Sequence, residues 1–345
     1  MRILVDLNHP AHVHLFRNAI LEWRKQGHEV LITARDKDLT LQLLQLYRLN
    51  YVKTAGVRKG LLAFPLGVLE LDWKILRFAR RFDPDWMIGT SFAIAHASKL
   101  VRGRSIVFAE DARGANRSFW LLVDPFADFI ATPDLLADNH GLHHLKYPSY
   151  QKLAYLHPRR FEPDPSIYSD LEIKVGQPYS LLRLVAFQAS HDVGHHGMTD
   201  ELKQNLISLL SNYGPVFISS EAPLSGPLKK YALNISPDRI HHALGFANLI
   251  VSESATMVTE AAILGTPALY CSSLVGSIPI IDELERKFGL AFQYPPANSW
   301  ELLGQVKRLM EQPNRKEEWR ERRKKMLAEK IDLTDWIVKL PFQLQ

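Results

Sequence analysis

The chain has 345 residues, a length that suits two α/β domains better than one core. Its 42 basic and 37 acidic residues give a formal net charge of only +5, which argues against a dedicated nucleic-acid-binding protein. A disulfide framework is excluded because Cys271 is the only cysteine. The start "MRILVDLNHP" lacks a signal-peptide pattern, and no apolar run reaches the length of a membrane span, so we expect a cytoplasmic protein.

Strand-like and helical segments alternate through the first half of the chain. "RILVDL" is typical of a buried strand, and the spacing of Val13, Phe16, Ile20 and Trp23 predicts a helix that Gly27 ends. The segments "HEVLITA", "YVKTAG", "DWMIGTS", "SIVFAE" and "ADFIATP" predict further strands, with helices in "LTLQLLQLYRL" and "LLAFPLGVLELDWKILRFARRF" between them. This alternation predicts a parallel sheet with helices on both faces.

The proline-rich segment 157–179 interrupts this pattern, which then starts again. "LLRLVAF", "PVFISSE", "NLIVSES" and "PALYCSS" predict strands, and helices are expected after the N-caps Thr199 and Ser236. The expected fold class is therefore α/β, with two Rossmann-like domains whose parallel sheets face a central cleft. We place these domains at 1–160 and 180–345 with a linker at 161–179, and expect the last helix to pack back on the N-terminal domain.

A polar turn follows the strand at the start of "VSESATMVTEAAILGTP", residues 251–267. Ligands of doubly wound sheets bind beyond the carboxyl ends of the strands, and the unpaired amides of the helix that begins near Thr256 suit a diphosphate. Ser252 and Ser254 add hydroxyl donors at the same point, and Met257 lies in the same turn. The sequence therefore predicts an anion site here, although it contains neither a P-loop nor a G-x-G-x-x-G motif.

Glu260 lies on the same helix face as Thr256, among apolar neighbours. An ionised carboxylate in such surroundings needs hydrogen-bond donors, and the two adjacent hydroxyls of a ribose would supply them. The alternative is an acid that complements the helix dipole or points to solvent.

"SPDRIHHALGFANLIVSESATMVTEAAILGTP" resembles the donor-binding segment of GT-B glycosyltransferases and of the non-hydrolysing UDP-N-acetylglucosamine 2-epimerases. "ILVDLNHPAHVHLFRNAI", "SYQKLAYLHPRRFEPDPS" and "FQASHDVGHHG" resemble DUF354, a family of uncharacterised prokaryotic proteins with an expected GT-B fold. The resemblance implies that Glu260 binds the ribose and that Ser254 and Thr256 lie near the phosphates. It does not imply an activity, because the family is defined by sequence alone.

Histidines crowd the loop after the first strand, where His12 is the first candidate for a catalytic base and His9 the second. Asp6 would orient either ring, and Asn8 is assigned to the acceptor side. The alternative is that these histidines cap the helix or pack against it. On the acceptor side we also place Glu110 and Asp111, for which a solvated loop is the alternative.

The loop "ASHDVGHHG" is expected to approach the donor phosphates, with a contact from His191 that Asp192 orients; a polar loop without a ligand is the alternative. Its glycines argue against a helical zinc site, and no metal is expected. His140, His143 and His144 are interpreted as surface residues. The basic, apolar segment 57–81 is either a core-packed helix or a contact with anionic lipid at the inner face of the membrane.

The favoured hypothesis is a metal-independent glycosyltransferase that uses a nucleotide-activated sugar, with UDP as the expected nucleotide and no cofactor. Its acceptor, a glycan, a lipid-linked or a small molecule, is not identified by the sequence. One alternative is a sugar-nucleotide 2-epimerase, which would need no acceptor. Another is a non-catalytic binding protein that shares the fold.

Overall fold

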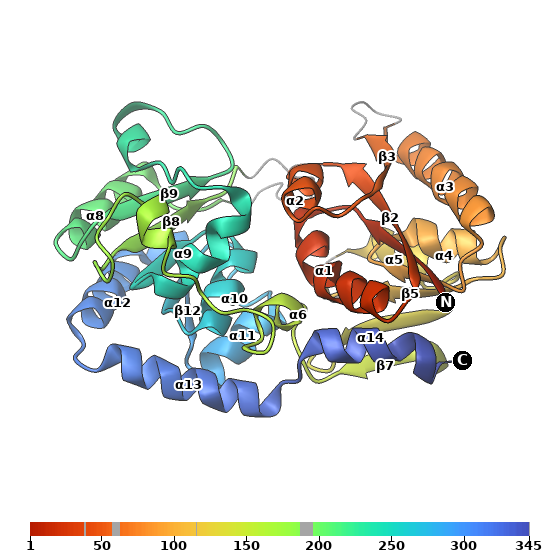
Figure 1. Ribbon diagram of the computed structural model, residues 1–345. Helices are drawn as coiled ribbons and strands as arrows, with labels where there is room; N and C mark the ends of the chain where they lie inside the picture. The colour runs from red at the N-terminus through yellow and green to blue at the C-terminus, as the bar shows by residue number, and fades with distance from the viewer. Residues whose placement is uncertain (38, 57–62, 115, 187–195, 345) are drawn as a thin grey trace. The chain divides into compact units, whose positions relative to one another are not determined.

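The computed structural model describes residues 1–37, 39–56, 63–114, 116–186 and 196–344 (Figure 1). The chain divides into two compact units. The first contains Met1–Arg160 together with Lys330–Gln345, and the second contains Phe161–Glu329. The chain therefore passes from one unit to the other twice.

A seven-stranded parallel sheet forms the centre of the first unit, with the strand order β3-β2-β1-β4-β5-β6-β7. The chain builds outward from β1 to β3, and then continues from β4 on the other side of β1. The order therefore reverses between β1 and β4, which is the position where doubly wound sheets bind ligands. The strands are β1 (Arg2–Leu7), β2 (Glu29–Asp36), β3 (Val52–Gly56), β4 (Trp86–Gly89), β5 (Arg104–Phe108), β6 (Phe129–Pro133) and β7 (His144–Tyr147).

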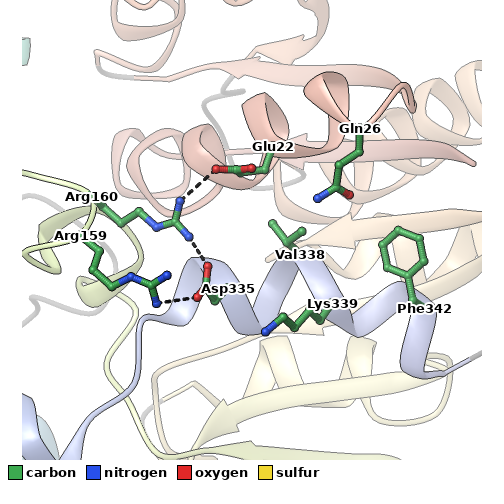
Figure 2. Close-up of a pocket in the computed structure, with 8 residues that line it drawn as sticks. All are labelled: Glu22, Gln26, Arg159, Arg160, Asp335, Val338, Lys339 and Phe342. Atoms are coloured by element: carbon green, nitrogen blue, oxygen red, sulfur yellow. Dashed lines mark hydrogen bonds and ion pairs between the residues drawn. The ribbon is translucent and has the colours of Figure 1, made fainter.

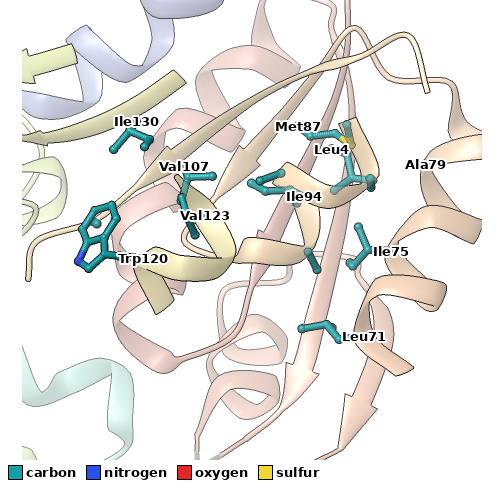
Figure 3. Close-up of a cluster of buried hydrophobic side chains, with 14 residues drawn as sticks. Leu4, Leu71, Ile75, Ala79, Met87, Ile94, Val107, Trp120, Val123 and Ile130 are labelled. Carbon is teal, nitrogen blue, oxygen red and sulfur yellow. The ribbon is translucent and has the colours of Figure 1, made fainter. Parts of the chain in front are cut away.

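Helices cover this sheet because one side of each is apolar. Leu4 of β1, Ile75 of α3, Ile94 of α4 and Val107 of β5 are all buried, and Figure 3 shows them in one cluster with Trp120 of α5. The helices of this unit are α1 (Pro10–Lys25), α2 (Thr40–Leu46), α3 (Ala63–Phe82), α4 (Phe92–Ser98), α5 (Arg117–Val123), α6 (Leu153–Leu156), α14 (Leu333–Gln343) and the 3-10 helix η1 (Gly141–His143).

The C-terminal helix α14 packs against α1. Trp23 of α1 is fully buried, and its Nε1 donates to the Val338 carbonyl oxygen at 3.2 Å. Beside this contact lies a pocket of about 320 Å³, in which Arg160 forms ion pairs with Glu22 and Asp335 (Figure 2). The two acids that line the pocket thus both pair with Arg160.

The second unit contains a five-stranded parallel sheet with the order β12-β11-β10-β8-β9, so its strand order reverses between β8 and β10. The strands are β8 (Ser180–Leu184), β9 (Val216–Ser220), β10 (Leu249–Ser252), β11 (Ala268–Cys271) and β12 (Ala291–Tyr294). The helices are α7 (Ile167–Asp170), α8 (Asp200–Ser211), α9 (Ile240–Phe246), α10 (Ala255–Leu264), α11 (Pro279–Arg286), α12 (Ser299–Glu311) and α13 (Arg315–Glu329), with the 3-10 helices η2 (Gly226–Tyr231), η3 (Pro237–Arg239) and η4 (Pro296–Asn298).

The predicted fold class, α/β with two parallel-sheet domains, is confirmed. Thr199 caps α8 by accepting from the Leu202 amide at 3.2 Å, as expected. Ser236 occupies the expected N-cap position, with Pro237 first in the 3-10 helix η3 that leads into α9, but its hydroxyl donates to Asp238 and accepts from none of the described helix amides. Within the described residues, no helix combines the length and the apolar character needed to cross a membrane.

Candidate functional site

The carboxyl ends of β1 and β4 bring together residues that are distant in the sequence. Asn8 and His12 follow β1, and Thr90 and Ser91 follow β4. Thr90 Oγ1 lies 2.6 Å from His12 Nδ1 and 3.0 Å from His12 Nε2. Thr90 was not predicted from the sequence, because its contact with His12 depends on the pairing of β1 with β4.

His12 is half-buried, and its Nδ1 accepts from the Asn8 amide at 3.3 Å. A neutral ring with this bond carries its proton on Nε2. Desolvation by the surrounding atoms, followed by the charges of His9, Lys37 and Lys152, lowers the pKa of His12 to about 3. His12 is therefore uncharged at neutral pH.

His9 is the N-cap of α1, where its Nδ1 accepts from the Ala11 amide at 3.2 Å. His9 thus caps the helix, as in the alternative interpretation of these histidines. Asp6 is buried and accepts from Thr33 Oγ1 at 2.6 Å and from Asn8 Nδ2 at 2.8 Å. Asp6 therefore orients the side chain of Asn8, while the backbone amide of Asn8 donates to His12.

The two acceptor-side acids differ in their surroundings. Glu110, after β5, forms an ion pair with Lys152 and accepts from the Gln151 amide at 2.9 Å. It thus fixes the loop that precedes α6. Asp111 is exposed.

In the second unit, the polar turn that begins at Ser252, the last residue of β10, leads directly into α10. Ser252 Oγ accepts from the Ser254 amide at 2.9 Å and donates to the Ser254 carbonyl oxygen at 3.0 Å. Ser254 is the N-cap, since its hydroxyl accepts from the Met257 amide at 3.5 Å. Thr256, half-buried, lies in the first helical turn, so the expected amide-rich helix start is present one residue earlier than predicted.

Glu260 is buried, with 5% of its surface exposed, and it faces α9. Its Oε1 lies 3.1 Å from Nε2 of His241, which is itself buried. A carboxylate in apolar surroundings requires such a partner. The contact of His241 with Glu260 was not predicted from the sequence, because it depends on the packing of α9 against α10.

Glu253 is a second buried acid at this strand end and was not predicted from the sequence. It accepts from the Val185 amide at 2.7 Å and from the Met198 amide at 2.6 Å. Burial raises the pKa of Glu253. These two bonds join the chain on both sides of 187–195, and the predicted contacts of His191 and Asp192 lie outside the described residues.

The interpretation of His140 as a surface residue is wrong. Its side chain is 1% exposed, pairs with Asp124 at 2.8 Å and stacks on Trp120 with the ring centroids 4.2 Å apart. The outward side of α3 carries exposed Leu69 and Trp73, while Ile75 on its other side is buried. Among the described residues, no group of three or more His, Cys, Asp or Glu side chains is placed to hold a metal ion.

The model of the DUF354 family, described as a protein of unknown function, matches residues 1–62. Over 100% of both chains, the structure is similar to the UDP-GlcNAc 2-epimerase from Neisseria meningitidis bound to UDP-GlcNAc, with 13% identity and a TM-score of 0.68. The chain has a GT-B fold.

The glycosyltransferase VinC and the protein MurG share this fold. VinC in complex with dTDP has 14% identity and a TM-score of 0.64, over 99% of this chain and 98% of that one. MurG from Acinetobacter baumannii has 14% identity and a TM-score of 0.61, over 99% and 100%. The resemblance to DUF354 and the GT-B fold expected from it are thus confirmed. None of the curated proteins matches the sequence.

The low pKa of His12 predicts a specific dependence of stability on pH. The ring titrates near 6.5 in the unfolded chain and near 3 in the folded one, so between these values the unfolded state binds more protons. The free energy of unfolding therefore falls as the pH decreases, with His12 contributing up to about 1.4 kcal/mol per pH unit. Urea unfolding of His12→Gln should show a shallower decrease below pH 6.5 than the wild type; parallel curves would contradict the prediction.

Proposed function

We propose that this protein is a metal-independent glycosyltransferase whose donor is a UDP-sugar. One observation carries the proposal: the serine turn and the start of α10 lie where the strand order of the second sheet reverses, with Glu260 on the same helix. Solved structures with the same fold include one bound to UDP-GlcNAc and one in complex with dTDP. Both ligands contain a pyrimidine nucleotide.

In the proposed complex, the diphosphate binds the amides at the start of α10. Ser254 and Thr256 add hydroxyl groups there, and Met257 lies beside them. A helix start stabilises anions through its amides and its dipole, so the leaving diphosphate needs no divalent ion. Glu260 accepts from the ribose hydroxyls while His241 holds its Oε1.

The proposed acceptor binds the first unit near Asn8, Glu110 and Asp111. His12 is the proposed base and His9 the second candidate. In both rings Nδ1 accepts from a backbone amide, so the neutral ring presents Nε2–H. Proton abstraction by Nε2 therefore requires that the ring proton first move to Nδ1, which breaks the bond to that amide.

A thermal-shift screen of UDP-, GDP-, CDP- and dTDP-sugars tests the proposal. We expect UDP-sugars to raise the melting temperature most, because a ligand that binds only the folded state stabilises it by mass action. If none of the sugar nucleotides raises the melting temperature, the proposed donor site does not exist.

The likeness to the Neisseria meningitidis epimerase supports a second candidate, a sugar-nucleotide 2-epimerase. Analysis of the products separates the two activities. An epimerase converts the sugar nucleotide by itself, whereas a transferase releases the nucleotide only when an acceptor is present.

The contact between Glu260 and His241 favours a third candidate, a non-catalytic protein. In that case the carboxylate serves the scaffold, and Glu260 substitutions would change stability without changing nucleotide binding.

A further inference from the structure

A second pocket, of about 280 Å³, lies in the second unit away from the proposed donor site. It is lined by Asn248 and Thr266, which precede β10 and β11 at the amino ends of these strands. The serine turn follows β10 at the opposite, carboxyl end. A strand of this length separates the two edges of the sheet by about 13 Å.

Four cationic side chains of α13 line this pocket: Arg315, Lys316, Arg320 and Arg323. No Asp or Glu is among the described residues that line it. Arg315 and Arg323 are half-buried, and Lys316 and Arg320 are exposed. The pocket thus concentrates positive charge, with two of its guanidinium groups partly shielded from water.

The two half-buried arginines are held by carbonyl groups. Arg323 Nε donates to the Ile263 carbonyl oxygen at 2.8 Å, and Arg315 Nη1 donates to the Leu309 carbonyl oxygen. Gly265 allows this arrangement, because a Cβ at its position would lie 2.9 Å from Arg323 Cδ. A guanidinium group has five N–H donors, so one such bond does not use its capacity to bind an anion.

Desolvation lowers the pKa of both Arg315 and Arg323. The contrast is Arg160 of the first unit: burial lowers its pKa too, but the hydrogen bonds and charges of Asp332, Asp335 and Glu22 together outweigh this effect and the pKa is raised. Acids balance the positive charge of Arg160. Among the residues that the structure describes, no acid lines the second pocket to do the same for Arg315 and Arg323.

The backbone offsets only part of this charge. The C-terminal ends of α9 and α10 line the pocket, and each contributes about half a negative charge. Arg320 is also paired with Glu317. The four cations of the pocket are offset by about one negative charge from the two helix ends and one from Glu317. The net charge around the pocket is therefore about +2. This balance favours an anion.

We propose that this pocket binds the phosphate group of a small anionic ligand. Guanidinium groups match the oxygens of a phosphate through paired N–H donors, and Lys316 adds a further cation at the rim. Phe246 and Tyr168 form an aromatic wall that contacts the non-phosphate part of the ligand. The site is independent of the proposed donor site.

Inorganic pyrophosphate is the probe, titrated into the full chain by calorimetry at constant ionic strength. The test variant is Lys316→Glu/Arg320→Glu, whose exposed positions make a folding defect small. The control is Lys324→Glu/Lys325→Glu on the same helix, since neither residue lines the pocket. Arg320 and Lys324 each pair with an acid three residues earlier, and both variants exchange two cations for two anions.

The wild type is expected to bind pyrophosphate, the test variant about tenfold more weakly, and the control within about twofold of the wild type. Equal weakening in the two variants would reduce the effect to net charge and overturn the proposal. Binding that persists in the test variant, or no binding by the wild type at millimolar pyrophosphate, also overturns it.

Discussion

Replacing Glu260 with glutamine is expected to weaken UDP binding by roughly 10- to 100-fold. A carboxylate accepts from two ribose hydroxyls, whereas an amide offers one acceptor oxygen and places an NH₂ group where the second acceptor was. Hydrogen bonds to a charged group contribute about 1.5–3 kcal/mol, which corresponds to this range. Calorimetric titration with UDP measures the change directly.

The matched control is Glu285→Gln, a substitution of an acid that holds Gln293 on the edge strand β12. It should leave UDP affinity unchanged. The melting temperature of unliganded Glu260→Gln provides a second readout, because the contact with His241 is also altered. A variant that melts at a lower temperature yet binds UDP as tightly as the wild type would show that Glu260 stabilises the fold and does not bind the ribose.

Replacing Trp23 with alanine is expected to destabilise the first unit by about 3–5 kcal/mol. The side chain is fully buried between α1 and α14, so its removal leaves a cavity, and the Val338 carbonyl oxygen loses its donor. Both effects raise the free energy of the folded state relative to the unfolded state. Urea unfolding followed by far-UV circular dichroism should show an earlier transition for one of the two units.

Trp300→Ala is the control for this experiment, because Trp300 is 72% exposed at the start of α12. The same atoms are removed there without a cavity, so the expected change is within about 0.5 kcal/mol. Similar midpoints for the two variants would mean that α14 does not stabilise α1 in the way described.

Ten strands were predictable because local sequence determines them, whereas β7 and β12 were not predicted. Buried parallel strands give short apolar runs, and Gly27 and Gly265 mark helix ends at which the backbone adopts φ of +84° and +86°. The position of the polar turn after β10 was predictable for the same reason: parallel strands carry ligand-binding turns at their carboxyl ends.

The partners of the site residues were not predictable, since they depend on which elements become neighbours. Thr90 reaches His12 across 78 positions of sequence, and Glu253 reaches Val185 across 68. Both contacts follow from strand order, which local periodicity does not encode. His140 was misinterpreted because its neighbours in the sequence are polar. The Trp120 ring on which it stacks lies 20 positions earlier in the chain.

The return of the chain to its first unit has a consequence for how the protein is made. Residues 1–160 leave the ribosome long before Lys330–Gln345 do. The side of α1 around Trp23 therefore has no contact with α14 while the second unit is being translated. Nascent chains that stall within that unit would present an uncovered apolar helix to chaperones. The first unit is therefore completed only after the second unit has been synthesised.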